Sequence, residues 1–487
     1  MFSNLYSKDK VYKNLVGGNW KGGNISENID IFSPIDNIEV GKVPSMTRDD
    51  VDEVIKEAHK AKKAWEGTSI GDKAEILYNT ARLIDENLDK LSDLLVLEIG
   101  KDKKSAISEV ERTADFIRFT ADTSRTIVGE IIKGESFPKS DRKKISLVDR
   151  VPVGVVLAIS PFNYPINLSA SKIAPALMAG NTVILKPATQ GSISALCLAE
   201  MFHKAGIPNG VLNTVTGKGS DIGDYIVTHE GINFINFTGS TEVGSRISKI
   251  TAMVPTLMEL GGKDAAIVLE DADLKSTVKN IVDGAFSYSA QRCTAIKRVV
   301  VINDICDELI SLLKEEINKL KIGNPLKEQV TIVPLINSKA ADFVQDLIED
   351  AKEKGAKVIT GDKKVNNLVY PTLLDNITED MRVAWEEPFG PVLPVIRVKD
   401  IDEAIEIANK SKYGLQSTVF TKDIDKAFYV ANRLEVGTVQ VNNKTERGPD
   451  NFPFLGVKES GFGAQGIRYS IEAMSRIKCT VIKIDKN

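Results

Sequence analysis

The chain has 487 residues, of which 42% are hydrophobic, so it is long enough for two or three domains with sizeable cores. Its 63 Lys and Arg residues against 67 Asp and Glu residues give a net charge of −4, which provides no general attraction for nucleic acid or for an anionic membrane. No stretch approaches the roughly 20 apolar residues that span a bilayer. The four cysteines form no C-x-x-C pair and the three histidines lie far apart, so we expect a cytoplasmic protein without disulfides or a metal site.

Local motifs predict the elements of the N-terminal region. Gly-Gly turns predict a hairpin over residues 12–23. Thr47 and Asp50 form the T-x-x-D cap of a helix whose apolar residues recur at three- and four-residue spacing. The same periodicity predicts amphipathic helices over about 72–99 and about 104–125.

The next segment, residues 126–152, has alternating apolar residues around a Gly/Ser/Pro centre and a basic run. This composition predicts a protruding hairpin arm. Residues 477–484 form a late strand, which we expect to pair with the arm of the same subunit or of a neighbouring one.

Two series of strands alternate with helix-length segments in the rest of the chain. Short apolar runs of this kind are typical of a parallel sheet that helices cover on both faces, and the first series comprises residues 153–160, 182–187, 211–216 and 232–238. The pattern restarts after Gly261 and Gly262 and continues to about residue 450. The predicted fold class is therefore α/β, with two doubly wound α/β domains.

Three polar residues near predicted strand ends are candidates for catalysis. Cys293 lies between small polar residues and a β-branched run, as a nucleophile on a tight turn would, although a buried structural cysteine fits the same pattern. Glu259 ends a short apolar run and is either a general base or a paired structural carboxylate. Asn163 follows a strand and has two possible roles: its amide N–H stabilises a developing oxyanion, or the residue only forms the turn after the strand.

A nucleotide site is indicated at the same ends of the strands. Gly239 and Gly244 lie between a strand and a helix, where backbone N–H groups are able to bind a phosphate. The segment lacks the G-x-G-x-x-G pattern, however, and a turn without a ligand fits it equally well. Lys186 stands at the carboxyl end of a strand, where such folds bind nucleotides. With Cys293 and Glu259, this site describes oxidation of an aldehyde through a cysteine thioester, with hydride passing to a nicotinamide.

Seven motifs in family order and spacing carry a resemblance. The chain resembles the aldehyde dehydrogenase superfamily over nearly its whole length, through SPFNYP (160–165), VILKPA (183–188), TGSTEVG (238–244), ELGGK (259–263), QRC (291–293), EEPFGP (386–391) and LGVKESGFG (455–463). The resemblance implies that Cys293 is the nucleophile, that Glu259 is the base for the deacylating water, and that Asn163 and the Cys293 N–H form the oxyanion hole. One departure is Ala290, at a place that is commonly Gly.

The resemblance also implies how the chain is organised and where the cofactor binds. Residues 1–125 and 148–259 would form the cofactor-binding domain, 260–450 the catalytic domain, and 126–147 with 465–487 a small β oligomerisation arm of a homotetramer. Lys186 and Glu387 would hold ribose hydroxyls, and Phe389 would pack near the nicotinamide. The full set of implied cofactor residues is Ser160, Lys186, Thr189, Gly239, Ser240, Gly244, Glu387 and Phe389.

Within the superfamily, three stretches resemble the non-phosphorylating, NADP-dependent glyceraldehyde-3-phosphate dehydrogenases: PATQGSIS (187–194), QRCTAIKR (291–298) and NNKTERGPDNFPFLG (442–456). This group belongs to glycolysis and oxidises the triose phosphate directly to 3-phosphoglycerate. The implied cofactor is NADP, with NAD weaker. The implied substrate residues are Arg112, Asn163, Tyr164, Arg292, Thr294 and Arg447.

Other functions stay open at this point. One alternative is a dehydrogenase of another small aldehyde, such as lactaldehyde or succinate semialdehyde. A CoA-acylating dehydrogenase would not need Glu259 as a base. A non-catalytic protein on the same fold is the alternative from another class, and the combination of Cys293, Glu259 and Asn163 argues against it.

The residue at position 189 generates a test of cofactor choice. NAD-preferring relatives commonly carry Glu three residues after the strand-end Lys, whereas Thr189 does not repel a 2′-phosphate. Lys186 is then able to pair with that phosphate, a contact worth roughly 1.5–3 kcal/mol. Thr189→Glu should abolish the preference for NADP through like-charge repulsion. The ratio of kcat/KM for NADP and NAD measures this, and an unchanged ratio would refute the interpretation.

Overall fold

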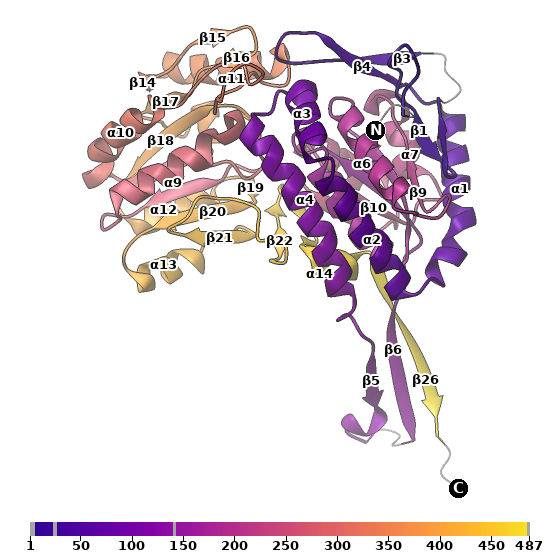
Figure 1. Cartoon of the computed structure of the whole chain (residues 1–487). Coiled ribbons are helices and arrows are strands. Elements are labelled where there is room, and N and C mark those ends of the chain that lie inside the picture. The colour runs from indigo at the N-terminus through magenta and orange to yellow at the C-terminus, as the bar shows by residue number, and fades with distance from the viewer. Residues whose placement is uncertain (1–4, 23–26, 140–142, 485–487) are drawn as a thin grey trace.

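The computed structural model describes residues 5–22, 27–139 and 143–484. Two lobes, each built around a mainly parallel sheet, lie side by side, and an arm projects from one of them (Figure 1). The predicted α/β class is confirmed. The sheets lie in the stretches of sequence where the alternation of strands and helices predicted them.

The first lobe contains a six-stranded sheet in the order β24-β11-β10-β7-β8-β9. The five strands from β11 to β9 pair in parallel, and β24 pairs antiparallel with β11. The strands are β7 (Val155–Ser160), β8 (Thr182–Pro187), β9 (Leu212–Thr214), β10 (Phe234–Thr238), β11 (Thr256–Glu259) and β24 (Gly461–Phe462). The helices that follow four of them are α5 (Asn167–Met178), α6 (Ser192–Lys204), α7 (Gly219–Thr228) and α8 (Thr241–Ile250).

The second lobe contains a seven-stranded sheet in the order β14-β17-β18-β13-β12-β20-β21. The strands are β12 (Ala265–Val268), β13 (Arg298–Ile302), β14 (Lys357–Thr360), β17 (Thr372–Asp375), β18 (Val392–Val398), β20 (Gln416–Phe420) and β21 (Thr438–Val441), and only β14 is antiparallel to its neighbour. Its helices are α9 (Leu274–Phe286), α10 (Asn303–Ile317), α11 (Ser338–Glu353), α12 (Ile401–Asn409) and α13 (Ile424–Ala431). Separate apolar clusters fill the two faces of this sheet.

Short elements connect the larger ones. The 3-10 turns are η1 (Gly134–Ser136), η2 (Ser287–Ala290) and η3 (Arg382–Ala384). The short antiparallel pairs are β15 (Lys364–Val365) with β16 (Leu368–Val369), β19 (Tyr413–Gly414) with β23 (Val457–Lys458), and β22 (Phe454–Leu455) with β25 (Ala464–Gln465).

The N-terminal region agrees with its motifs except at one helix. The predicted hairpin is β1 (Asn14–Val16) with β2 (Asn19–Lys21), and a second one pairs β3 (Asn28–Phe32) with β4 (Glu39–Pro44). Thr47 and Asp50 form the predicted capping box of α1 (Arg48–Glu66).

The single helix predicted over 72–99 is wrong, because the segment forms α2 (Ile70–Asp85) and α3 (Leu88–Ile99). Asn87 lies at the break, and its side-chain amide donates to the Leu83 carbonyl at 2.7 Å. This local bond competes with continuation of the backbone ladder. The next helix, α4 (Lys103–Ser124), has nearly the predicted bounds.

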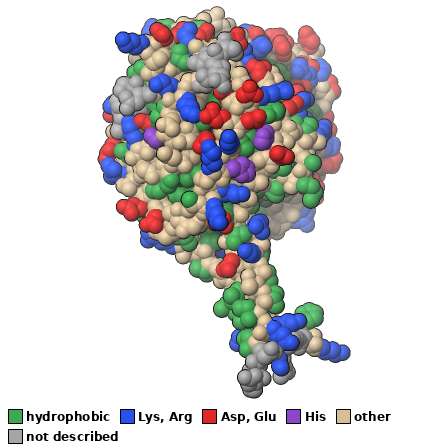
Figure 2. Space-filling model, turned by 90° about the vertical axis from the view of Figure 1, so that its right-hand side faces the viewer, with side chains coloured by type: hydrophobic (Ala, Val, Ile, Leu, Met, Phe, Trp, Pro, Cys, Tyr) green, Lys and Arg blue, Asp and Glu red, His purple; other side chains and the backbone are tan. Residues whose placement is uncertain are grey.

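The arm is an antiparallel sheet in the order β26-β6-β5, made of β5 (Glu130–Lys133), β6 (Lys144–Pro152) and β26 (Ser475–Lys483). The late strand therefore pairs with the arm of its own chain. Apolar side chains gather along the arm (Figure 2), and Val128, Ile131, Ile477 and Val481 are each at least 60% exposed.

One part of the segment expected in the arm lies elsewhere. Helix α14 (Ile467–Ala473) precedes β26, and Ile467, Ile471 and Met474 are buried in the core that α4 and α5 share. The C-terminal part of the arm begins only at Ser475. Among the described residues, no helix is both long and apolar enough to cross a membrane.

Candidate active site

The predicted nucleophile and base are in direct contact. The Cys293 thiol donates a hydrogen bond to Glu259 Oε1 at an Sγ–O distance of 3.3 Å. Burial and the adjacent Glu259 carboxylate raise the pKa of the Cys293 thiol well above its usual value. The thiol is therefore protonated in this arrangement, and its proton faces a carboxylate that is able to accept it.

Glu259 lies at the end of β11, is 2% exposed, and is held from two further sides. Its Oε2 atom accepts from Thr238 Oγ1 and from Arg447 Nη1, both at 3.1 Å. A buried carboxylate is stable only when its oxygens are hydrogen-bonded or paired with charge. Glu259 is thus fixed by a hydroxyl from the neighbouring strand and by a guanidinium from the 442–456 loop.

The sequence-based prediction missed Lys172, which lies behind this carboxylate. Lys172 is fully buried in α5, and its ammonium donates to Thr238 Oγ1 at 2.6 Å. Burial lowers the pKa of Lys172 to about 7. The detectable signal was the only charged residue of the helix NLSASKIAPALM, whose residues are all buried.

Asn163 contacts the turn that carries the nucleophile. Its side-chain amide donates to the Gln291 carbonyl at 2.9 Å, and the residue is 3% exposed. An asparagine amide has two N–H donors, so one remains for an oxygen formed next to Cys293. This geometry is compatible with the predicted oxyanion hole.

Three consecutive residues before the cysteine adopt left-handed backbone conformations. Tyr288, Ser289 and Ala290 have φ values of 53°, 52° and 60°. Ser289 anchors the turn, because its hydroxyl donates to the Val333 carbonyl at 2.8 Å and accepts from the Val333 N–H at 2.7 Å. A positive φ favours glycine, which explains in physical terms why glycine is common at the place of Ala290.

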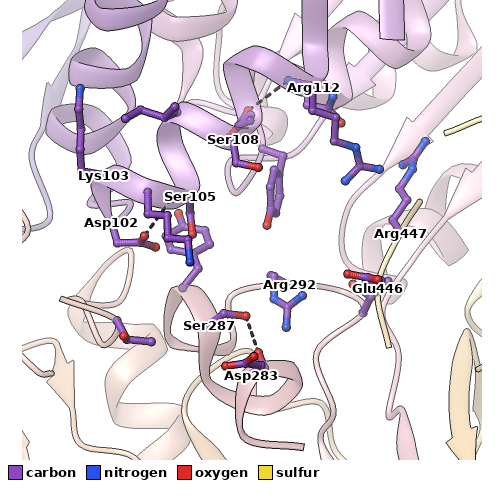
Figure 3. A pocket seen from close by; sticks show the side chains of 18 of the residues that line it. Asp102, Lys103, Ser105, Ser108, Arg112, Asp283, Ser287, Arg292, Glu446 and Arg447 are labelled. Atoms are coloured by element: carbon purple, nitrogen blue, oxygen red, sulfur yellow. Dashed lines mark hydrogen bonds between the residues drawn. The ribbon is translucent and has the colours of Figure 1, made fainter. Parts of the chain in front are cut away.

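A cavity of about 960 Å³ opens in front of Cys293 and Glu259. Its lining includes every predicted substrate residue except Asn163, namely Arg112, Tyr164, Arg292, Thr294 and Arg447. Figure 3 shows Arg112 and Arg447 pointing toward one another from one side, with Arg292 across the cavity. Residues that are far apart in sequence therefore bring three guanidinium groups to one site.

The three arginines are oriented by partners within the chain, and Arg112 and Arg447 both lie against Asp450. Arg112 makes a two-pronged ion pair with Asp450, with both N–O distances at 2.7 Å. Arg447 contacts Glu259 and lies 3.9 Å from Asp450. Arg292 donates to the Gly284 carbonyl at 2.5 Å, while its buried Nε has no partner among the described residues. An acceptor brought by a ligand would satisfy that donor.

Tyr164 is held by a buried ion pair beneath the cavity. Lys101 and Glu109 pair with no exposure of either side chain, and the Lys101 ammonium lies 3.4 Å from the centre of the Tyr164 ring. Burial raises the pKa of Tyr164 to about 12. Its hydroxyl therefore stays protonated and is available as a donor toward the cavity.

The predicted dinucleotide residues lie at the carboxyl ends of β8 and β10. Lys186 ends β8 and donates to the Gly217 carbonyl at 3.2 Å, and burial lowers its pKa to about 8. Gly239 and Ser240 form the turn into α8, and the Ser240 hydroxyl accepts from the Val243 N–H. Thr189 is partly buried and follows Lys186 by three residues.

Two of these glycines are required by close packing. A Cβ on Gly239 would lie 2.6 Å from the Phe237 ring, and one on Gly244 would lie 2.4 Å from Leu260. The N–H groups of both glycines donate to backbone carbonyls, of Glu259 and of Ser240, so both residues also fix the backbone of the turn. Close packing therefore requires glycine at both positions, which the sequence pattern of the turn did not show.

The remaining predicted cofactor residues, Glu387, Phe389 and Ser160, are each held by contacts with neighbouring elements. Glu387 Oε1 accepts from the Gly262 N–H at 3.2 Å and pairs with the Lys297 ammonium at 2.9 Å. The Phe389 ring packs edge-on against Phe162 at 5.9 Å. The Ser160 hydroxyl accepts from Ser169 at 2.8 Å.

The donor set fits a nicotinamide dinucleotide. An anion-accepting turn, a strand-end lysine and a carboxylate near Cys293 are the groups that pyrophosphate and ribose hydroxyls require. No acidic side chain occupies position 189, so a 2′-phosphate meets no repulsion there.

Comparison with known proteins agrees with this geometry. A profile of the aldehyde dehydrogenase family matches residues 20–480. The chain belongs to the aldehyde dehydrogenase family. Membership confirms the resemblance that the seven motifs carried.

Individual members of the family are similar over their whole length. The NADP-dependent glyceraldehyde-3-phosphate dehydrogenase of Streptococcus equinus is 55% identical over 98% of this chain and 100% of its own. The protein of the same description from Pisum sativum is 46% identical over 97% of this chain and 96% of its own. The crystal structure of NADP-dependent glyceraldehyde-3-phosphate dehydrogenase from Bacillus halodurans C-125, complexed with NADP, has a TM-score of 0.96 and 52% identity, covering 97% of this chain and 99% of that one.

The left-handed turn generates a stability test. Ala290→Gly removes a backbone strain of about 1 kcal/mol and a buried methyl group worth about 0.8 kcal/mol, so the two effects nearly cancel. Ala114, fully buried in α4, is the matched control. Ala114→Gly should lower the free energy of unfolding by about 1.5–2 kcal/mol, because helix propensity and burial then act together. Denaturant unfolding of both variants makes the comparison, and equal losses would contradict the strain at Ala290.

Proposed function

We propose that this aldehyde dehydrogenase catalyses the NADP-dependent, non-phosphorylating oxidation of glyceraldehyde 3-phosphate to 3-phosphoglycerate. The observation that carries the proposal is the hydrogen-bonded Cys293 and Glu259 pair at a cavity that Arg112, Arg292 and Arg447 line. The balanced reaction consumes the aldehyde, NADP⁺ and water and yields the acid, NADPH and protons.

In the first half of the reaction, Cys293 attacks the aldehyde carbon. The thiol proton passes to the Glu259 carboxylate, 3.3 Å from the sulfur, and the thiolate forms a carbon–sulfur bond. The negative charge that develops on the aldehyde oxygen is stabilised by the free amide N–H of Asn163 and by the Cys293 N–H. Loss of hydride from the same carbon leaves a thioester on Cys293.

The cofactor would be held by residues of both lobes. Lys186 and Thr189 would receive the adenosine 2′-phosphate, the turn from Gly239 to Gly244 the pyrophosphate, and Glu387 the ribose hydroxyls. When bound, the nicotinamide supplies the hydride acceptor. Phe389, whose ring packs against Phe162, would close one side of the nicotinamide site.

In the second half, Glu259 acts as a general base. After Glu259 has released the thiol proton to solvent, its carboxylate removes a proton from water. The oxygen of that water attacks the thioester carbon, and the carbon–sulfur bond breaks to release the acid and the Cys293 thiolate. Thr238 and Arg447 keep the carboxylate near Cys293 during this step. A CoA-acylating enzyme would transfer the acyl group to a thiol and would not need this base.

The substrate phosphate is assigned to the three arginines. A dianion pairs well with planar guanidinium forks, and Tyr164 adds a neutral donor. A neutral aldehyde such as lactaldehyde would leave these cations without a ligand partner. Succinate semialdehyde would bring one carboxylate, which offers fewer acceptor oxygens and less charge than a phosphate.

The organisation of the chain follows from the same proposal. Residues 1–125 and 148–259 would bind the cofactor, residues 260–450 would supply the nucleophile, and the exposed apolar arm would join subunits into a homotetramer. We assign the protein to the cytoplasm and to glycolysis.

Turnover of glyceraldehyde 3-phosphate with NADP and without inorganic phosphate tests the reaction directly. Faster oxidation of lactaldehyde or succinate semialdehyde would refute the assignment of glyceraldehyde 3-phosphate as the substrate.

The two catalytic roles predict different defects. Cys293→Ala should abolish turnover, whereas Glu259→Ala should still acylate and should slow release of the acid by about 10²- to 10⁴-fold. Rapid-mixing experiments should then detect a burst of NADPH, and mass spectrometry should detect the thioester on Cys293. Near-normal steady-state turnover of the Glu259 variant would show that another group activates the water.

The arginines predict a contrast between two substrates. Arg112→Ala and Arg447→Ala should each raise KM for glyceraldehyde 3-phosphate about ten- to a hundredfold, from loss of a charged contact of roughly 1.5–3 kcal/mol. Only Arg447 also contacts Glu259, so only its variant should slow oxidation of unphosphorylated glyceraldehyde. We expect Arg112→Ala to oxidise glyceraldehyde at the wild-type rate. Equal effects of the two variants on glyceraldehyde would contradict this division of roles.

A further inference from the structure

Lys297 is a buried cation in contact with the nucleophile's own backbone. It follows Cys293 by four residues, at the start of β13, and is 1% exposed. Its ammonium donates to the Cys293 carbonyl. The same ammonium pairs with Glu387 Oε1 at 2.9 Å. One lysine therefore joins the cysteine turn to a residue of the proposed cofactor site, and we name this set of three groups the Lys297 bridge.

The bridge is closed by Gly262. The Gly262 N–H donates to the same Glu387 oxygen at 3.2 Å, and a Cβ on Gly262 would lie 3.2 Å from the Cys293 carbonyl. Glu387 itself is close to the neighbouring glycine, because a Cβ on Gly261 would lie 2.1 Å from Oε2. Glu387 and the Cys293 carbonyl therefore both lie close to the backbone of the Gly261–Gly262 turn.

Other buried cations nearby do not share this arrangement. Arg298 donates to the backbone carbonyls of Lys263, Ile407 and Ala408. The Lys263 ammonium has no hydrogen-bond partner among the described residues, and burial and the Arg298 and Lys297 charges lower its pKa well below the usual value. Lys297 is thus the cation of this cluster whose charge is matched by a carboxylate and which also contacts Cys293.

We infer that Lys297 is a positioning residue that fixes both the Cys293 turn and the Glu387 carboxylate. The inference rests on the proposed roles of Cys293 as nucleophile and Glu387 as ribose ligand. A buried charge must be balanced by partners in good geometry, so the lysine imposes a single relative position on the two groups that it joins. The reacting sulfur and the nicotinamide need such a fixed separation, because small displacements are costly in rate.

The Lys297 charge also gives the inference a second readout. Burial and Glu259 raise the pKa of the Cys293 thiol, whereas the Lys297 and Arg447 charges lower it. Removal of the Lys297 charge should therefore make the thiolate harder to form. Glu387 offsets the ammonium, so removal of the Glu387 charge should act in the opposite direction.

The test measures thiol ionisation and cofactor affinity without an aldehyde. Alkylation of Cys293 by iodoacetamide is followed against pH by mass spectrometry, in a Cys479→Ser background because Cys479 is exposed. Lys297→Gln keeps a hydrogen-bond donor without the charge, and Lys297→Met removes both. In each variant the pH midpoint of alkylation should rise by about one unit, since one adjacent charge shifts a pKa by about that much. The Kd for NADP should rise about tenfold, the change expected for loss of one charged partner of Glu387.

Three further variants separate positioning from general stability. Lys297→Arg keeps the charge and should restore the wild-type midpoint. Glu387→Gln, at a partly exposed position, should lower the midpoint, so the proposal stays testable even if the Lys297 variants do not fold. Lys73, a buried lysine in α2 that donates to the Glu66 carbonyl, is the matched control, and Lys73→Gln should change the Tm but neither the midpoint nor the Kd.

A midpoint and a Kd that stay at the wild-type values in folded Lys297→Gln would overturn the inference, as would an upward shift in Glu387→Gln. Neither readout depends on which aldehyde is oxidised. Failure of the proposed function would appear separately, as turnover in Cys293→Ala or as preference for another substrate.

Discussion

The active site depends on one buried carboxylate. Glu259 is 2% exposed, and an unpaired charge at that depth would be strongly destabilising. Its oxygens contact a hydroxyl on β10, a guanidinium on the 442–456 loop and the thiol of the cysteine turn. These partners come from both lobes, so the charge that the proposed deacylation needs also contributes contacts between the lobes.

Much of the fold was predictable because its signals are local. Apolar runs located β7, β8, β9 and β10 of the first sheet, the Thr47 cap located α1, and the motif around Cys293 indicated the proposed nucleophile. The break at Asn87 was missed, because a side-chain bond to Leu83 overrode a continuous apolar stripe. The only sequence signal for that bond is a single asparagine, and an analysis of apolar periodicity takes no account of it.

The groups that tune the site were not predictable in the same way. Arg112 and Asp450 are 338 positions apart, and nothing near either residue announces the other. Lys172 and Lys297 look like ordinary basic residues in sequence, and only burial against Thr238 and Glu387 gives them a role. The three predicted arginines line one cavity, but the ion pairs that balance their charge could be seen only in the three-dimensional structure.

The two edge strands of the arm affect how strongly the chain tends to aggregate. β5 and β26 are the outer strands of its sheet, so each leaves one row of backbone donors and acceptors unmatched within the arm. Such rows are able to pair with a strand of any other chain, whether in a specific assembly or in an aggregate. Lysines at 478 and 483 interrupt the apolar residues of β26, and charged side chains of this kind hinder indiscriminate growth of a sheet. The arm that we propose as a subunit interface thus combines apolar residues, which favour pairing with one partner strand, with charged residues, which disfavour open-ended growth of the sheet.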